Sequence, residues 1–193
     1  MALQIMTRLE VPEHEGSLCA TDDCLNSGTF LCEDCDIQTP LCNTCILKCH
    51  LYLPLHRPMR WNGSFFERIS LKDIGKVWHV SHGGKACPYV DNNNGIQELT
   101  IVDTTGIHNV CIGYCRCWNS VGFAEQLLYA KLFPASLQRP KTAFTFRVLR
   151  LFHILNLIAH ITSWDFSGTM KRVTDNVDMK SPPVYHLIVA IQL

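Results

Sequence analysis

The sequence predicts an α+β fold in which small cysteine-rich domains precede a short helical segment. Three observations predict this class. Cysteine and histidine residues are concentrated between residues 19 and 56, a β-rich stretch with a tight turn occupies residues 98–114, and a helical period of apolar residues runs over residues 142–162. With 193 residues, of which 47% are hydrophobic, the chain can form two or three small domains with a real core.

The N-terminal residues 1–17 are expected to form a flexible tail rather than a targeting segment. They contain one basic residue, and they lack the apolar core of roughly 7–15 residues that a secretory signal needs. Elsewhere the sequence has no apolar run of roughly 18 residues, so no membrane span is expected. The 11 cysteines are therefore expected in a reducing compartment, the nucleus or the cytoplasm, where an odd number of thiols argues against a disulfide framework.

The first module, residues 18–60, has the ligand spacing of two zinc ions. It contains two Cys-x2-Cys pairs, and the two-residue turn lets both thiolates reach one ion at about 2.3 Å. A looser cysteine pair precedes them, and two histidines with a proline between them follow. The eight candidate ligands are Cys19, Cys24, Cys32, Cys35, Cys42, Cys45, His50 and His56.

The two ions could be bound in sequence or in an interleaved, cross-brace-like order, and the late histidines favour the second. One ion would take Cys19, Cys24, Cys42 and Cys45, and the other would take Cys32, Cys35, His50 and His56. Cys49 is spare, and because it is adjacent to His50 it could replace that ligand. Each zinc contributes about 10–16 kcal/mol, which so short a segment cannot obtain from apolar burial. The module is therefore expected to be unfolded without metal.

Residues 61–135 are predicted to form a second cysteine-rich domain built on a β-hairpin. Trp61–Phe66 is interpreted as a strap from the first module, and Ser70, with Asp73, as the cap of a short helix that ends at Gly75. The runs Glu98–Asp103 and Ile107–Tyr114 then flank a Thr-Thr-Gly turn.

This domain also contains the candidate ligands of a third zinc ion. Cys87, Cys115 and Cys117 would need one histidine to complete a site, either His82, which we prefer, or His108. The alternative is that these thiols are buried without a ligand role, as expected for Cys111, which faces the other side of its strand.

Residues 136–193 are predicted to form a helical segment that is cut short. An amphipathic helix is expected from Thr142 to about Thr162, and a second one from Ser163 to about Val173. Residues 131–172 carry seven basic residues and one acidic residue, whereas residues 1–60 carry four basic and eight acidic ones. Arg147 and Arg150 on the polar stripe of the first helix are therefore the candidate DNA contacts.

No enzyme signature is found in the sequence. It lacks a P-loop, a dinucleotide-binding glycine motif, a His-Glu-x2-His motif and a nucleophile elbow. Each predicted zinc site is filled by four protein ligands, which leaves no position to activate water. We therefore expect no enzymatic activity and no small-molecule substrate.

The order of residues along the chain closely resembles one known family, the CxC-type cysteine-cluster domain associated with KDZ transposases. The resemblance runs from about Cys19 to Pro183. It rests on Leu53-Pro54-Leu55-His56-Arg57, Trp61-Asn62-Gly63, Ser70-Leu71, Gly75, His82, Cys87-Pro88, Asp103-Thr104, Gly106-Ile107-His108, Cys115-Arg116-Cys117, Phe133-Pro134-Ala135, Thr142-Ala143-Phe144-Thr145-Phe146 and Thr174-Asp175-Asn176. It implies a zinc-binding accessory segment of a transposase that stops before the catalytic region, and the apolar end at Leu193 suggests a gene fragment.

Three functions remain open at this point. The segment could help a transposase to dock on DNA through its basic helix. It could instead be a protein-interaction adaptor, because the interleaved ligand order resembles the B-box class of zinc domain and the first module is acidic. It could also be a decayed transposon fragment that folds around zinc without a further role.

Overall fold

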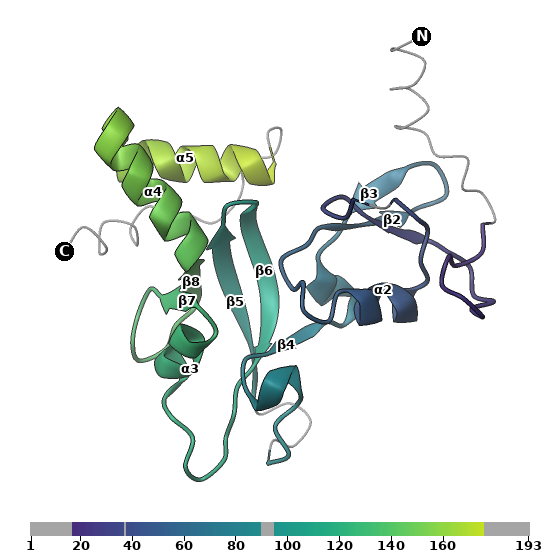
Figure 1. The fold of residues 1–193 in the computed structure, drawn as a ribbon, viewed down its shortest axis with the longest axis horizontal. Helices are drawn as coiled ribbons and strands as arrows, with labels where there is room; N and C mark the ends of the chain where they lie inside the picture. The colour runs from purple at the N-terminus through teal and green to yellow at the C-terminus, as the bar shows by residue number, and fades with distance from the viewer. Residues whose placement is uncertain (1–16, 37, 90–94, 176–193) are drawn as a thin grey trace. The chain divides into compact units, whose positions relative to one another are not determined.

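The computed structural model describes residues 17–36, 38–89 and 95–175, and it divides the chain into two compact units after Gly75 (Figure 1). Both units combine strands with helices, which confirms the predicted α+β class. The first unit ends at Gly75 rather than at Arg60, the boundary expected from the sequence, and the helical residues after 135 belong to the second unit instead of forming a separate segment. The N-terminal tail and the apolar C-terminal end lie outside the described residues.

Among its described residues, the first unit contains a three-stranded antiparallel sheet in the order β1-β2-β3 and one α-helix. Its elements are β1 (Phe30–Cys32), α2 (Asn43–Cys49), β2 (Pro58–Trp61) and β3 (Phe66–Arg68). The expected strap is in fact the β2–β3 turn, because the Asn62 side chain accepts hydrogen bonds from the backbone N–H groups of Ser64 and Phe65. Gly63 has a φ of 100° in this turn, where a residue without a β-carbon is favoured.

A short 3-10 helix, η1 (Leu71–Ile74), closes the first unit as the sequence predicted. Ser70 and Asp73 form a capping box, and Gly75 ends the turn in the left-handed region with φ 88°. Leu71 is buried, which anchors the turn.

The second unit is built on a five-stranded mixed sheet in the order β4-β6-β5-β8-β7. Its strands are β4 (Val77–His79), β5 (Ile96–Asp103), β6 (Gly106–Gly113), β7 (Leu132–Pro134) and β8 (Thr142–Thr145). The predicted hairpin is confirmed, since β5 and β6 pair antiparallel from Ile96↔Gly113 to Asp103↔Gly106. The edge strand β4 runs parallel to β6, and β8 runs parallel to β5. The other edge strand, β7, pairs antiparallel with β8.

Two helices of this unit, α4 (Phe146–Ala159) and α5 (Ser163–Thr174), follow β8 along the chain (Figure 1). The prediction of a helix from Thr142 was wrong for its first four residues, which form β8 and pair with β5. The helical spacing of apolar residues extends back to Phe144, in β8, because Phe144 and Val148 pack into the same apolar cluster. Thr145 then caps α4, as its side chain accepts from the N–H of Val148. The second predicted helix is confirmed, with Thr162 as its cap.

The helices pack on the hairpin through one apolar cluster. It contains Val102, Ile107, Phe144, Val148, Phe152, Phe166 and Met170. The end of α5 is fixed to the hairpin turn, because the Thr174 hydroxyl oxygen accepts the Ile107 N–H at 2.7 Å and donates to the Met170 carbonyl at 2.8 Å. Within the described ranges, every helix is too short or too polar to cross a membrane.

Candidate metal centres

The structure brings cysteine and histidine side chains together in three groups of four among the described residues. In each group the four ligand atoms lie within 4.8 Å of one another. Tetrahedral coordination at about 2.3 Å for sulfur and about 2.0–2.1 Å for nitrogen implies ligand separations of about 3.8 Å between sulfurs and about 3.5 Å between sulfur and nitrogen. The separations within each group can be compared with these values.

The first group consists of Cys19, Cys24, Cys42 and Cys45. The sulfur of Cys24 lies 3.8 Å from those of both Cys42 and Cys45, which is the tetrahedral edge for four thiolates. The loop that contains the first two cysteines is closed by the Cys19 N–H, which donates to the Asn26 carbonyl at 2.8 Å. Asn26 also directs its side-chain amide toward two of the sulfurs, at 3.6 and 3.8 Å. Cys19 therefore joins this group despite its wider spacing from Cys24.

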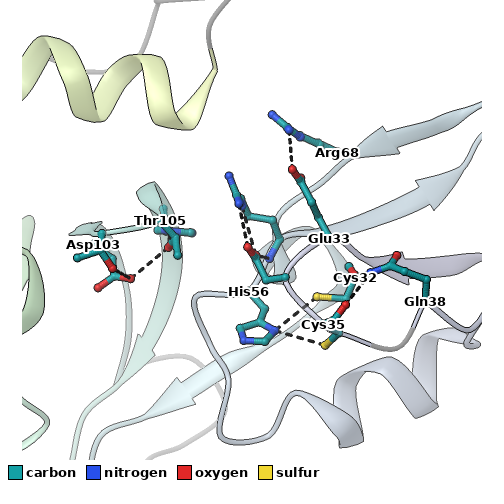
Figure 2. A network of polar contacts seen from close by, with 12 residues as sticks. Cys32, Glu33, Cys35, Gln38, His56, Arg68, Asp103 and Thr105 are labelled. Carbon is teal, nitrogen blue, oxygen red and sulfur yellow. Dashed lines mark hydrogen bonds and ion pairs between the residues drawn. The ribbon is translucent and has the colours of Figure 1, made fainter. Parts of the chain in front are cut away.

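The second group consists of Cys32, Cys35, His50 and His56. The His56 Nδ1 lies 3.5 Å from both sulfurs (Figure 2). The His50 Nε2 lies 3.4 Å from the sulfur of Cys35. His50 is buried, and its Nδ1 lies 2.8 Å from the Ile46 carbonyl oxygen, which can only accept. The proton is therefore on Nδ1, and the Nε2 lone pair is directed at the group.

Polar side chains hold the loop between Cys32 and Cys35 in place. The Gln38 amide donates to the carbonyls of both cysteines at 2.7 Å (Figure 2). Arg57, which follows His56, donates to both carboxylate oxygens of Asp34, at 2.8 and 3.2 Å from its side chain. Burial acts to raise the pKa of Asp34, but the hydrogen bonds and charge of Arg57 outweigh it and hold that pKa below its usual value. The Arg57–Asp34 pair thus joins the Cys32–Cys35 loop to the segment that carries His56, without involving the ligand atoms themselves.

The third group consists of His82, Cys87, Cys115 and Cys117. The His82 Nε2 lies 3.2 Å from the sulfur of Cys115 and 3.6 Å from that of Cys117, and the Cys87 sulfur lies 4.0 and 3.8 Å from the same two. These separations scatter around the tetrahedral values. His82, rather than His108, is the histidine of this group, since the His108 Nε2 lies 2.9 Å from the Thr105 hydroxyl.

Backbone conformation places His82 at this group. His82 has a φ of 49° and is followed by Gly83 and Gly84 at 64° and 85°, so three consecutive residues are left-handed. A non-glycine residue in this region is unfavourable, and such strain persists where the surrounding contacts maintain it. The preceding strand β4 is also closely fitted, because a β-carbon at Gly113 would lie 2.3 Å from the His79 Nδ1.

Gln126 on α3 (Phe123–Tyr129) fixes the other side of the third group. Its buried side chain accepts the Cys115 N–H at 2.7 Å, and it donates to the carbonyls of Cys115 and Val121 at 3.0 and 2.9 Å. The loop that carries Cys115 and Cys117 is therefore held by one side chain from a neighbouring helix.

Crowding of thiols in the third group separates their pKa values. The Arg116 N–H, followed by further hydrogen-bond partners, lowers the pKa of Cys87 to about 6. Burial acts in the opposite direction, but these hydrogen bonds outweigh it. Hydrogen bonding to the Cys115 sulfur, burial and the Cys87 sulfur raise the pKa of Cys117 to about 12. Three thiolates cannot coexist here without a neutralising charge, which a divalent cation would supply.

The chain matches the model of one known family. The family model of the CxC2 like cysteine cluster associated with KDZ transposases matches residues 71–178, more than half of the chain. The chain belongs to this CxC2 family. No curated protein and no solved structure matches it.

The third group lies inside the CxC2 match, whereas the first two groups lie ahead of residue 71. All twelve candidate ligands predicted from the sequence fall into the three groups, and the first two follow the interleaved order. Cys49 and Cys111 belong to none of the groups found among the described residues, and Cys49 is exposed. Sequence reasoning missed Gln38, which bonds to carbonyls three and six residues earlier, and Gln126, which reaches Cys115 from α3.

The two arginines predicted to contact DNA lie in the first turns of α4. Arg147 is exposed but donates to the buried Asp103 at 3.0 Å, and Arg150 is exposed. Asp103 also accepts from the hydroxyls of Thr145 at 2.5 Å and Thr105 at 3.1 Å, the second of which appears in Figure 2. Arg147 thus supports the end of the hairpin, while Arg150 has no such carboxylate contact among the described ion pairs.

Proposed function

We propose that the chain is a zinc-stabilised accessory segment of a KDZ-transposase-associated protein and that its CxC2 unit contacts DNA. The observation that carries the metal assignment is the donor sets of the three groups: four sulfurs, two sulfurs with two nitrogens, and three sulfurs with one nitrogen. Such sets favour zinc, whereas calcium and magnesium prefer oxygen ligands.

A structural role for zinc follows from the completeness of each donor set. Four protein ligands leave no open position for water or substrate, so we expect stabilisation rather than catalysis at all three groups. The four-thiolate group would retain two negative charges with zinc, and the mixed second group would be neutral. The acidic first module is therefore a poor surface for phosphates.

DNA contact is assigned to the second unit because basic residues accumulate there. Residues 131–172 contain seven basic residues against one acidic residue. Arg150 on α4 and Lys171 and Arg172 in the last turn of α5 are partly or fully exposed. Charges of this kind bind phosphate backbones without reading the sequence.

The test is the salt dependence of duplex binding by the zinc-loaded chain. Each phosphate contact should contribute a slope of about 0.9 in log affinity against log salt concentration. Arg150→Ala should lower the slope by about one such contact. The matched control is Arg60→Ala in the first unit, where the arginine is also exposed and pairs with Glu67. A salt-independent affinity would contradict DNA contact and leave the zinc assignment in place.

Protein contact by the first unit is the second candidate function. Its interleaved ligand order resembles that of B-box-like interaction domains, and its net negative charge suits a basic protein partner. Cross-linking of the zinc-loaded chain to a transposase catalytic region would test it. Cross-links that fall in residues 17–75 would support an adaptor, and cross-links confined to the second unit would not.

A further inference from the structure

Two large aromatic side chains are displayed to solvent next to the third group. Trp118 is 97% exposed, and Tyr89 is 74% exposed. Trp118 directly follows Cys117, and Tyr89 comes two residues after Cys87. Single exposed apolar residues are common, but here two exposed aromatics flank ligands of one metal group in the sequence. We name residues 87–89 and 115–118 the aromatic knuckle.

The aromatic knuckle is held rigidly by the contacts of the third group. The sulfurs of Cys87 and Cys117 are 3.8 Å apart, and the Arg116 N–H donates to the Cys87 sulfur at 3.5 Å. Gln126 fixes the Cys115 backbone through two hydrogen bonds. The two aromatic rings are thus carried on segments whose separation is already set, which lowers the entropic cost of binding a ligand.

Arg116 lies within the aromatic knuckle, and Lys85 lies on the loop just before it. The Arg116 guanidinium lies 5.2 Å from the ring centre of Phe123, which itself stacks on Tyr114 at 4.5 Å. Lys85 is exposed on the loop before Cys87. The described stretches 76–89 and 113–122 contain no aspartate or glutamate. The positive charges of Arg116 and Lys85 offset the single negative charge that three thiolates and one histidine leave on a zinc ion.

We propose that the aromatic knuckle binds single-stranded nucleic acid, with bases stacked on Trp118 and Tyr89 and a phosphate near Arg116. Stacking platforms combined with cations are the elements by which proteins hold unpaired strands without reading their sequence. In a duplex the bases stack on one another, so their faces are not available to an exposed indole. This inference rests on the proposed DNA contact and adds the strand type and the residues that receive it.

The aromatic knuckle and the basic helices should therefore respond to different forms of DNA. Duplex affinity is expected to depend on Arg150, while affinity for an unpaired strand should depend on Trp118. A protein partner would also use exposed tryptophan and tyrosine, but the absence of carboxylates in the described stretches favours a polyanion.

The experiment uses the zinc-loaded full chain and fluorescence anisotropy with labelled oligothymidylate of roughly 20 nucleotides, which exceeds the about 4–16 nucleotides covered by a single-strand-binding fold. Trp118→Ala should weaken binding about 5- to 150-fold, the equivalent of about 1–3 kcal/mol for one stacked base. Trp118→Phe should retain most of the affinity, because a phenyl ring still stacks. Duplex affinity should remain unchanged in both variants.

The control is Trp164→Ala, which removes an indole that is 68% exposed on α5 and lies outside the aromatic knuckle. It should leave oligothymidylate binding unchanged. Native mass spectrometry of each variant should give the same number of zinc ions as the parent chain, which separates loss of stacking from loss of the third group.

The outcomes are distinguishable. Unchanged oligothymidylate affinity in zinc-replete Trp118→Ala would overturn the aromatic knuckle as a single-strand site, even if duplex binding persists and the proposed DNA contact stands. Binding of neither form by the parent chain would overturn both. Equal losses in Trp118→Ala and Trp164→Ala would also contradict the proposal, because they would show a general loss of aromatic surface.

Discussion

Replacement of Gln126 by leucine should weaken metal binding at the third group selectively. The substitution removes three hydrogen bonds, one to the Cys115 N–H and two to the carbonyls of Cys115 and Val121. Leucine preserves the helix propensity and the approximate volume of the side chain on α3. Loss of partners should therefore dominate the effect.

The magnitude follows from the exposure of the three groups that lose their partner. An unsatisfied buried group costs about 1–3 kcal/mol, and the low end applies here because Cys115 is only half-buried and Val121 is exposed. A total of about 3 kcal/mol corresponds to roughly a 100-fold loss of zinc affinity. Losses of about 10–100-fold are also typical when a residue that orients a metal ligand is removed.

The assay is competition of the Gln126→Leu chain with a chromophoric chelator, combined with counting of ions by native mass spectrometry. Gln38→Leu is the matched control, since Gln38 donates to the carbonyls of Cys32 and Cys35 in the second group and is itself exposed. It should affect the second ion, by a smaller factor, and leave the third unchanged. Full affinity for the third ion in Gln126→Leu would refute the reasoning.

Three further predictions concern stability and ligand identity. Gly106→Ala should destabilise the second unit by about 2 kcal/mol or more, because the φ of Gly106 is 129° and the new β-carbon would lie 2.8 Å from the Thr174 Oγ1. Thermal unfolding measures this loss, and a variant that unfolds at the same temperature as the parent chain would contradict the prediction. Burial opposes ionisation of Asp103, but the hydrogen bond from Thr145 and the charge of Arg147 keep its pKa below the usual value. Its contribution to the stability of the fold is therefore present above the ordinary carboxyl pKa of about 3.9 and is lost as pH falls through the lowered pKa. Asp103→Asn should therefore cost about 1–2 kcal/mol at neutral pH in urea unfolding, and the difference from the parent should shrink at acid pH; a constant difference would contradict the ionic role. Cys49→Ser should keep three zinc ions and His50→Ala should lose one, and the reverse result would make Cys49 the ligand.

Local chemistry allowed some elements to be predicted from the sequence. The capping box at Ser70 and the tight turn after Asp103 depend on residues within a few positions of one another. The ligand groups could be predicted as well, because the Cys-x2-Cys spacing restricts which thiols can share an ion.

Other features depended on contacts between distant segments. Thr142–Thr145 has helical period, yet it forms β8 because β5 offers a parallel partner at Thr100–Val102. Gln126 is a single glutamine on a short helix, so no local pattern marks its role at Cys115. The sequence favoured His82 over His108 as the fourth ligand, but it did not predict the left-handed turn at His82–Gly84, after which the His82 Nε2 lies 3.2 Å from the Cys115 sulfur.

The central claim is that metal ions supply the free energy that folds this chain. Native mass spectrometry of the intact chain, followed by thermal unfolding after exhaustive dialysis against EDTA, tests it most directly. The account predicts three zinc ions per chain and loss of cooperative unfolding in the metal-free chain, since each ion contributes about 10–16 kcal/mol. A metal-free chain that still unfolds cooperatively at the same temperature would contradict it.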